Sequence, residues 1–373
     1  MEESLRTLRE ERNTYSCAVR VPPEILTHIF LDVICDIYER DEEESIQQFY
    51  PPHVCRYWYE VASRSQQYWS YQRLADGELM PSHIIERAGG RPLHVWGYMS
   101  KYSPSCDFIR SQAESVKIST YGHSIPKSLE AFFSGAAPNL KSLMLSAPDT
   151  LITTPSIPKD TFDGNVPCLR SLTLHDVRWW WLSPIFVSSL THLTLRGPMR
   201  WGLTCIQTLQ QLPSLNYLDL TDTRAPEDRG TPFEPPWTHS PSVKLGRLKA
   251  LHLQGEVYDL GILALELSIP LSALITFHPT CTSGLADEPQ DLEPLLSWLS
   301  KHLQLLDRGS TPVYAMHLKY EEQEDAIILR LYHSPNPNID PIQLPKAEDA
   351  RPDLEVKFCY PYNRTTSSRI SYM

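Results

Sequence analysis

The sequence feature that most constrains the fold is the motif Leu-x-x-Leu-x-Leu, which occurs five times between residues 140 and 253. Successive copies start 29, 21, 25 and 33 residues apart, at Leu140, Leu169, Leu190, Leu215 and Leu248. In an extended chain the second and third leucines of a copy point to one face of a strand, while the first packs in the preceding turn. A single unit cannot bury its own apolar face, but stacked copies share a continuous core. The motif therefore predicts a solenoid with a layer of parallel strands.

Further elements are predicted on both sides of the repeats from the spacing of their apolar residues. Strands are expected at 92–96, 115–118, 312–320, 326–332 and 354–360. Helices are expected at 127–134, 207–212, 292–306 and 71–90, the last ending at glycines that can adopt the left-handed cap conformation. The strands at 312–320 and 326–332 form either a hairpin or a final repeat that caps the stack. The proline-rich segment 222–242 is expected to be an exposed loop.

The composition argues against several classes of protein. The 373 residues carry a net charge of −11, whereas non-specific binding to nucleic acid depends on a basic surface. No uninterrupted apolar run of about 18 residues is present, so we expect no membrane-spanning helix. The charged start, Met1-Glu2-Glu3-Ser4-Leu5-Arg6, lacks an apolar segment, and no signal peptide is expected.

The eight cysteines form no Cys-x-x-Cys pair and no regular framework. Cys35 and Cys55 fall on predicted apolar helix faces, where a free thiol behaves as a small hydrophobic side chain. Because reduced thiols are typical of those compartments, we expect a cytoplasmic or nuclear location, or both.

A second pattern lies near the N-terminus, between Val21 and Ser70. A proline is tolerated at the first position of a helix, because its missing N–H would have no partner there. Apolar residues at helical spacing follow Pro23, and we expect an amphipathic helix over 23–38 that ends before the acidic run 41–44. A second helix is expected to open at Pro51-Pro52, with an apolar face made by Val54, Cys55, Trp58, Val61 and Ala62.

Three pieces of this stretch together resemble the F-box, in the form common in mushroom-forming fungi. They are Pro22-Pro23-Glu24-Ile25-Leu26, then Val54-Cys55-Arg56-Tyr57-Trp58, then Trp69. F-box proteins dock through this small helical domain onto a Skp-type adaptor of a cullin–RING ubiquitin ligase, and a second domain captures a protein substrate. The resemblance implies the same partners here.

Carried over by position, the residues that face the adaptor are Pro22, Pro23, Glu24, Ile25, Leu26, Ile29, Val54, Cys55, Trp58 and Trp69. Some residues of the stretch must instead hold the three helices together. Phe30 and Trp58 are the first candidates for that role, because large aromatic side chains fill a small helical core.

The leucine motifs resemble leucine-rich repeats, but only in part. Such repeats usually carry Asn or Cys three residues after the last leucine, and here these positions hold Pro148, Val177, Pro198, Thr223 and Glu256. We therefore expect an irregular solenoid, with parallel strands of good quality and poorly matched crossovers.

The predicted fold class is a small all-α F-box-like domain followed by an α/β solenoid that resembles leucine-rich repeats. The predicted organisation is a charged N-terminal arm or short helix at 1–15, the helical domain at 16–75, a connecting helix or linker at 76–91, the solenoid at 92–361 and a loose tail at 362–373.

Sequence motifs for catalysis or for metal and cofactor binding are absent, so we expect no enzymatic activity, cofactor or metal site. His175, His192 and His252 fall in or just after repeat strands. A metal or catalytic role would need carboxylate or further histidine partners at matching depth. Otherwise these histidines are surface or interface residues.

Three consecutive tryptophans, Trp179, Trp180 and Trp181, cannot all face one core. They either pack between repeats or form a substrate-binding hot spot, since exposed tryptophan is enriched where partners dock. The leading functional hypothesis is thus a substrate-recognition subunit of a ubiquitin ligase. Two alternatives are a scaffold that acts without a ligase and an enzyme of unfamiliar type, which would need a pocket lined by perturbed titratable groups.

Overall fold

The computed structural model describes most of the predicted elements. The described ranges are 19–40, 54–74, 86–98, 106–120, 127–147, 155–198, 202–223, 243–270, 272–280, 293–308, 313–321, 326–333 and 354–359, with the single residues 4, 11, 12 and 15. The acidic run 41–44, Pro51-Pro52, the tail and most of the predicted arm, linker and loop at 222–242 lie outside these ranges. The chain divides into two compact units, Met1–Leu169 and Arg170–Met373.

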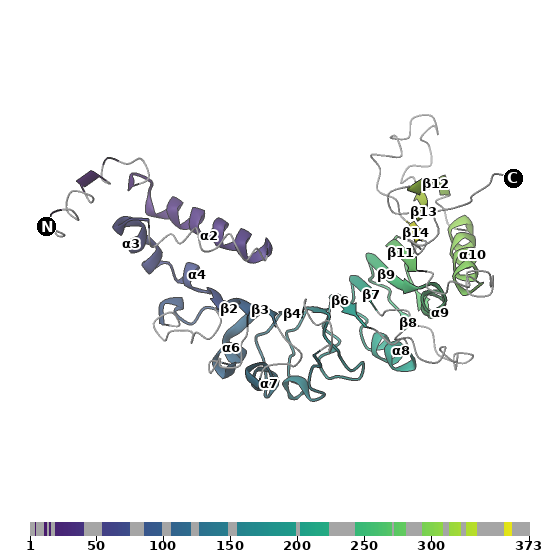
Figure 1. Cartoon of the computed structure of the whole chain (residues 1–373), viewed down its shortest axis with the longest axis horizontal. Coiled ribbons are helices and arrows are strands. Elements are labelled where there is room, and N and C mark those ends of the chain that lie inside the picture. The colour runs from purple at the N-terminus through teal and green to yellow at the C-terminus, as the bar shows by residue number, and fades with distance from the viewer. Residues whose placement is uncertain are drawn as a thin grey trace, which may run out of the picture. The chain divides into compact units, whose positions relative to one another are not determined.

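The first unit combines helices with four parallel strands (Figure 1). Its strands follow one another in sequence order, β1-β2-β3-β4. The elements are α2 (Pro23–Arg40), α3 (Arg56–Arg64), α4 (Gln66–Trp69), β1 (Tyr71–Leu74), β2 (Leu93–Tyr98), α6 (Cys106–Gln112), β3 (Ala113–Ser119), α7 (Lys127–Phe133), β4 (Ser142–Ser146) and the short 3-10 helix η4 (Thr161–Gly164).

The helix predicted over 71–90 is wrong at its start, where β1 forms instead. Tyr71 pairs with His94 and Leu74 with Gly97, so parallel pairing with β2 overrides the local helical pattern. The predicted glycine cap is confirmed, because Gly89 and Gly90 have φ values of +61° and +74° after a helical turn that ends at Ala88.

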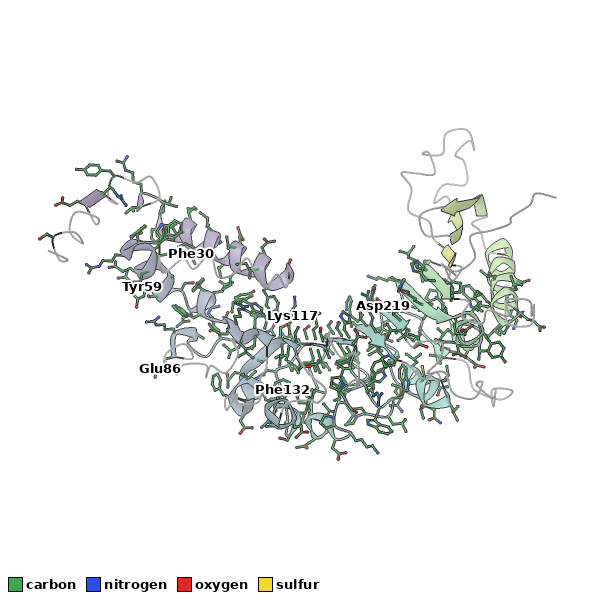
Figure 2. The ribbon with its side chains drawn as sticks, viewed as in Figure 1. Phe30, Tyr59, Glu86, Lys117, Phe132 and Asp219 are labelled. Carbon is green, nitrogen blue, oxygen red and sulfur yellow. The ribbon has the colours of Figure 1, made fainter. Side chains whose placement is uncertain are left out.

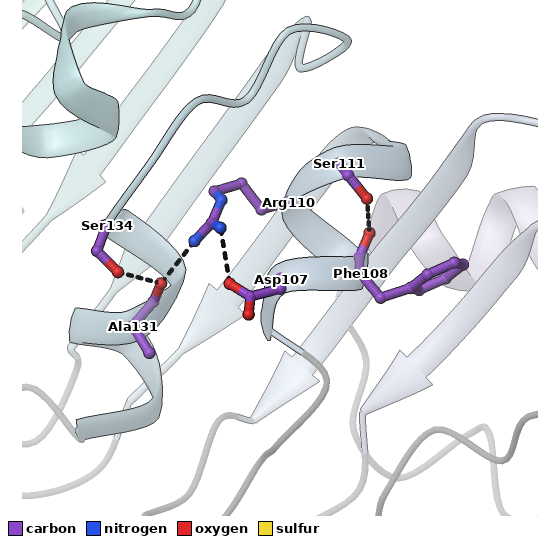
Figure 3. A network of polar contacts seen from close by, with 6 residues as sticks. All are labelled: Asp107, Phe108, Arg110, Ser111, Ala131 and Ser134. Carbon is purple, nitrogen blue, oxygen red and sulfur yellow. Dashed lines mark hydrogen bonds and ion pairs between the residues drawn. The ribbon is translucent and has the colours of Figure 1, made fainter.

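Polar contacts link the two helices α6 and α7 of this unit (Figure 3). The Arg110 guanidinium of α6 donates to the Ala131 carbonyl of α7 at 2.8 Å and pairs with Asp107 at 2.6 Å. Ser134 also donates to the Ala131 carbonyl, at 2.9 Å. Carbonyl groups near the end of a helix lack intrahelical donors. The two hydrogen bonds supply donors to the Ala131 carbonyl in the last turn of α7, and the one from Arg110 also links α7 to α6.

Aromatic side chains fill the space beside α7. Phe132 and Phe133 of this helix and Phe162 of η4 are at most 1% exposed. The Phe162 ring centroid lies 5.4 Å from each of the other two, in edge-on arrangements. The turn at η4 thus packs against α7 through Phe162 in the core of the unit.

The main sheet of the second unit contains six parallel strands as described, and β13 and β12 extend it through antiparallel pairing. The short strands β8 and β10 pair parallel in a separate two-stranded sheet. The order of the main sheet within the unit is β5-β6-β7-β9-β11-β14-β13-β12. The elements are β5 (Ser171–His175), β6 (His192–Gly197), α8 (Leu203–Gln210), β7 (Tyr217–Asp222), β8 (Val243–Lys244), β9 (Ala250–Glu256), α9 (Val257–Glu266), β10 (Leu267–Ser268), β11 (Leu274–Thr280), α10 (Glu293–Arg308), β12 (Val313–Glu321), β13 (Ala326–His333) and β14 (Leu354–Cys359).

The five leucine motifs lie as predicted, because all fifteen of their leucines are at most 2% exposed. In the second unit the strand leucines stand in register as two rows. The first row is Leu172, Leu193, Leu218 and Leu251, and the second is Leu174, Leu195, Leu220 and Leu253. Ile275 and Phe277 continue the rows on β11. The rows form the shared core that a stack of repeats requires.

The C-terminal strands confirm the predicted hairpin, since β12 and β13 pair antiparallel. The sequence did not indicate where the last strand would lie. β14 pairs parallel with β11 on one side and antiparallel with β13 on the other. The hairpin therefore joins the parallel strands through β14.

Helices α9 and α10 approach closely at Gly261. A Cβ atom at this position would lie 2.5 Å from the Leu295 backbone nitrogen and 2.8 Å from the Pro294 Cβ. The glycine thus permits the close packing of two helices whose side chains Leu260, Leu263 and Leu295 are buried. The observed fold is α/β with a mostly parallel, solenoid-like strand layer, as predicted. The unpredicted elements include strands β1 and β11 and helices α6 and α9.

We predict that Gly97→Ala destabilises the chain. Gly97 has a φ of +118°, and an added Cβ would collide with the backbone oxygen of Leu74 on β1. Strain at such a φ alone costs about 1–3 kcal/mol. Thermal and urea unfolding would measure the change. Gly246→Ala is the control, because nothing lies within 4 Å of a Cβ there; equal stability of the two variants would contradict this account.

Candidate functional site

The start of α2 is set by backbone and side-chain chemistry as the sequence predicts. The Leu26 amide donates to the Pro22 carbonyl at 3.0 Å, and the Thr27 hydroxyl donates to the Pro23 carbonyl at 2.8 Å. Glu24 lies in the first turn, where its carboxylate complements the helix dipole. The predicted helix is confirmed and extends two residues further than expected, to Arg40.

One face of α2 packs against α3 and α4. Leu26 and Phe30 are at most 1% exposed, and the Phe30 ring lies 5.1 Å from that of Trp58 and 6.2 Å from that of Tyr68. The structural role predicted for Phe30 is therefore confirmed, and half-buried Trp58 contributes to the same contact. Val61 and Ala62 of α3 complete the packed face.

Trp69 closes this helical core. It is 4% exposed, its Nε1 donates to the Ala62 carbonyl at 2.8 Å, and the Arg87 guanidinium lies 4.7 Å from its ring centroid. Arg87 also donates to the Tyr59 hydroxyl at 3.4 Å, and this contact lowers the pKa of Tyr59. The helical turn that contains Arg87 is thereby held against α3 and α4.

The structure corrects two of the residues assigned to the adaptor-facing surface. Leu26 and Trp69 lie in the helical core, because their positions in α2 and α4 direct them towards the neighbouring helices. The other assigned residues remain accessible: Pro22, Pro23, Glu24, Ile25, Ile29 and Val54 are exposed, and Cys55 and Trp58 are half-buried.

The exposed apolar residues define a candidate docking surface. Ile25 and Ile29 stand one turn apart on α2, 51% and 40% exposed, and Val54 is 51% exposed. The Tyr57 hydroxyl donates to the Val21 carbonyl at 2.8 Å, so the start of α3, next to Val54, lies beside the start of α2. We call Ile25, Ile29 and Val54 the apolar surface. Its side chains meet no described partner that would bury them.

The far end of α2 rests on the strands of the same unit. The Lys117 ammonium of β3 donates to the Tyr38 carbonyl at 2.7 Å and lies 4.3 Å from the Tyr38 ring centroid (Figure 2). The Tyr38 hydroxyl contacts the Ser115 hydroxyl, and its ring meets that of Trp96 at 5.5 Å. These residues alternate with buried Val95 and Val116, so α2 covers the strand face opposite the apolar core. The helical stretch is thus attached to the strand layer by packing as well as by chain connection.

The tryptophan triplet divides between core and surface. Trp180 is 51% exposed, which confirms that at least one of the three lies outside the core. Trp181 is only 9% exposed and stacks on Phe186, with ring centroids 5.9 Å apart. Its assignment to substrate binding is therefore corrected to core packing. Trp179 is half-buried and meets Trp181 edge-on at 5.9 Å.

His175, His192 and His252, weighed above as possible metal or catalytic residues, lie on the strand face of the second unit that points away from the leucines. His175 and His252 are half-buried and His192 is exposed. Burial, together with nearby Arg196, lowers the pKa of His175. Among the described residues, no group of three or more His, Cys, Asp or Glu side chains could hold a metal ion.

The sequence interpretation missed the ion pair between Arg196 and Asp219 on this face. The Arg196 guanidinium donates to an Asp219 carboxylate oxygen at 2.8 Å, and Asp219 is 1% exposed. The alternation within the repeat strands would have placed both side chains on the face opposite the leucines. Their pairing depends on the register between β6 and β7, which the sequence does not state.

Two further observations concern the cysteines and the apolar character of the described helices. Cys35, Cys55, Cys168 and Cys205 are free thiols, and Cys205 is buried, which raises its thiol pKa. Across the described ranges, no helix has both the length and the apolar character needed to cross a membrane.

Comparisons with models of protein families, with curated proteins and with solved structures find no match.

We predict very unequal effects on stability for two neighbouring substitutions on α2. Leu26→Ala removes a fully buried side chain and should lower the free energy of unfolding by about 2–5 kcal/mol. Ile25→Ala removes an exposed side chain and should change it by no more than about 0.5 kcal/mol. Urea unfolding of both variants tests the assignment of core and surface. A larger loss for Ile25→Ala than for Leu26→Ala would refute it.

Proposed function

We propose that this chain is an F-box-like substrate-recognition subunit, which docks through the apolar surface on a Skp-type adaptor of a cullin–RING ubiquitin ligase and captures a protein with its repeats. The observation that carries the proposal is the exposed pair Ile25 and Ile29, on a helix whose adjacent face is already packed through Leu26 and Phe30. The resemblance of 21–70 to the F-box supplies the identity of the partner.

The energetics favour a partner for this surface. Burying the exposed parts of two isoleucines contributes on the order of 1–3 kcal/mol, before the neighbouring prolines and Val54 are counted. Exposed apolar side chains that adjoin one another are typical of a docking surface. Glu24 and Asp32 are exposed on the same helix, so the surface has a polar rim, as protein interfaces usually do.

The contacts between α2 and the strands fix the apolar surface relative to β2 and β3. The contacts of Tyr38 with Lys117, Ser115 and Trp96 fix the C-terminal part of the docking helix on β2 and β3. An adaptor bound at the start of α2 would therefore hold the first repeat strands in a defined orientation. Such a connection suits a subunit that presents one protein to another.

The proposed subunit performs no chemistry itself, because ubiquitin transfer is carried out by other components of the ligase. Substrate capture is assigned to the second unit, where Trp180 and the nearby Leu182, 65% exposed, supply apolar contact area. Exposed tryptophans of this kind often dominate the binding energy of an interface.

The adaptor contact is tested with Ile25→Asp/Ile29→Asp. Two carboxylates cannot be buried without partners, so adaptor binding should weaken at least about tenfold, measured by isothermal titration calorimetry. The fold should survive, since both side chains are exposed.

Leu296→Asp is the matched control, because Leu296 is also exposed, at 54%, but lies on α10 of the other unit. It should bind the adaptor like the unmodified chain. Equal adaptor binding by the double variant and this control would refute the assignment of the surface. Co-purification of a cullin with the unmodified chain would then test whether the bound adaptor belongs to a ligase.

The contribution of Trp180 is tested by Trp180→Ala. Affinity capture followed by mass spectrometry should show specific loss of a subset of the proteins retained by the unmodified chain, with adaptor retained in both. The melting temperature should stay within about 2 °C, because the side chain is half exposed. Unfolding of the variant, or an unchanged set of captured proteins, would rule out this role.

A further inference from the structure

Strand β12 forms one edge of the strand layer, as far as the structure describes it (Figure 1). It pairs with β13 on one side, and no described strand pairs with it on the other. An edge strand presents backbone N–H and C=O groups that can pair with another chain. Natural edges are often short or interrupted by proline, whereas β12 has nine residues and contains neither proline nor glycine. It therefore offers a long edge for pairing.

Two rows of apolar residues reach this edge. By register, the first row consists of Ile275, Leu354, Leu331 and Met316, and the second of Phe277, Val356, Leu329 and Leu318. In a stack of repeats each unit covers its neighbour, and the last unit needs a polar outer side. Here both rows end on β12 with an apolar residue. A further strand paired with β12 would continue the rows and cover their ends.

The residues of β12 match a second copy of the same strand. Pairing with β13 is irregular only between Val313 and Ala315, so 315–321 forms a regular segment. The central residue of this segment is Leu318. Two such segments that pair antiparallel around a twofold axis at this residue leave no residue of either segment unmatched. The strand of a second copy therefore fits this edge without a further bulge.

The matched residues are compatible on both faces of the paired strands. Directly opposite residues of an antiparallel pair lie on the same face of a sheet. On the face of the apolar rows the pairs are Leu318 with Leu318 and Met316 with Tyr320, and on the other face they are His317 with Lys319 and Ala315 with Glu321. No two carboxylates stand opposite each other. The segment carries one lysine and one glutamate, so the net charge of −11 of the whole chain is not repeated at this edge.

We propose that β12 binds β12 of a second copy of this chain and forms a twofold-symmetric dimer, paired antiparallel about Leu318. Backbone hydrogen bonds between the two strands supply the affinity, as in other cases of strand addition to a sheet edge. The assembly closes at two chains, because each copy uses its edge for the other. The inference does not depend on the adaptor contact. Under the proposed function, the dimer would carry two apolar surfaces for adaptors, one on each chain.

The test measures the oligomeric state of the full chain by sedimentation velocity over a concentration series. Monomer should convert to dimer as the concentration rises, without larger assemblies, because the twofold pairing occupies the edge of both copies. Amide hydrogen exchange is then compared below and above this conversion. Peptides that cover 313–321 should exchange more slowly in the dimer, since the outward amides of β12 gain acceptors there. Peptides that cover β6 and β7 should exchange equally in both states.

Substitutions test the register through the pair of His317 and Lys319. His317→Glu places a carboxylate opposite Lys319 of the second copy, twice in the dimer, so the dissociation constant should fall about two- to thirtyfold. His317→Glu/Lys319→Glu places two carboxylates opposite each other, and the dissociation constant should rise above that of the unmodified chain. The matched control is His317→Glu/Lys301→Glu, which has the same net charge but reverses an exposed lysine of α10. It should dimerise as tightly as His317→Glu.

Three results would overturn the proposal. They are a chain that stays monomeric up to about 1 mM, a dimer without protection of 313–321, and equal dissociation constants for the two double variants. Thermal unfolding of the monomers checks that the two double variants are equally folded. Adaptor binding measured on the same samples separates this outcome from the proposed function. A monomeric chain that binds the adaptor refutes only the dimer, and a dimer that binds no adaptor refutes only the adaptor contact.

Discussion

The structure depends on the register between its parallel strands. Leu172 stands beside Leu193, Leu218 and Leu251, and a shift of one residue on any strand would turn its leucines to the opposite face. Because the leucine rows are buried almost completely, that shift would expose the core, and a single register is selected. The same register decides which residues meet on the other face. The pairing of Arg196 with Asp219 is thus a consequence of the packing of the adjacent leucines Leu195, Leu218 and Leu220.

The non-core strand face is used differently in the two units. In the first unit, Tyr38 and the C-terminal part of α2 cover it through Lys117, Ser115 and Trp96. In the second unit, the described strands leave Arg196 and His192 exposed on it. The non-core face of the strand layer thus carries α2 in the first unit, and in the second unit it exposes polar side chains at the positions described. Both arrangements are possible because every second strand residue stays outside the leucine core.

Much of the fold could be predicted from the sequence, because the spacing of buried apolar residues within one helix or strand is a local feature of the chain. The leucine motifs, the helix that begins at Pro23 and the hairpin of β12 and β13 were all predicted. Strand β1 was not, because its four residues acquire their conformation only by pairing with β2, and the place of β14 depends on long-range pairing. The candidate surface was predicted in part. Helical spacing alone could not separate Ile25 from Leu26, since the choice depends on where Phe30 and Trp58 meet.

The most direct test of the central claim, that the start of α2 is a docking surface, is amide hydrogen exchange of the full chain with and without a Skp-type adaptor. The account predicts slower exchange in peptides that cover residues 22–33 and 54–58, because a partner would cover Ile25, Ile29 and Val54 and suppress local opening there. Exchange in β5, β6 and β7 should stay the same. Protection of those strands with none at the start of α2, or no change anywhere at saturating adaptor, would contradict the claim.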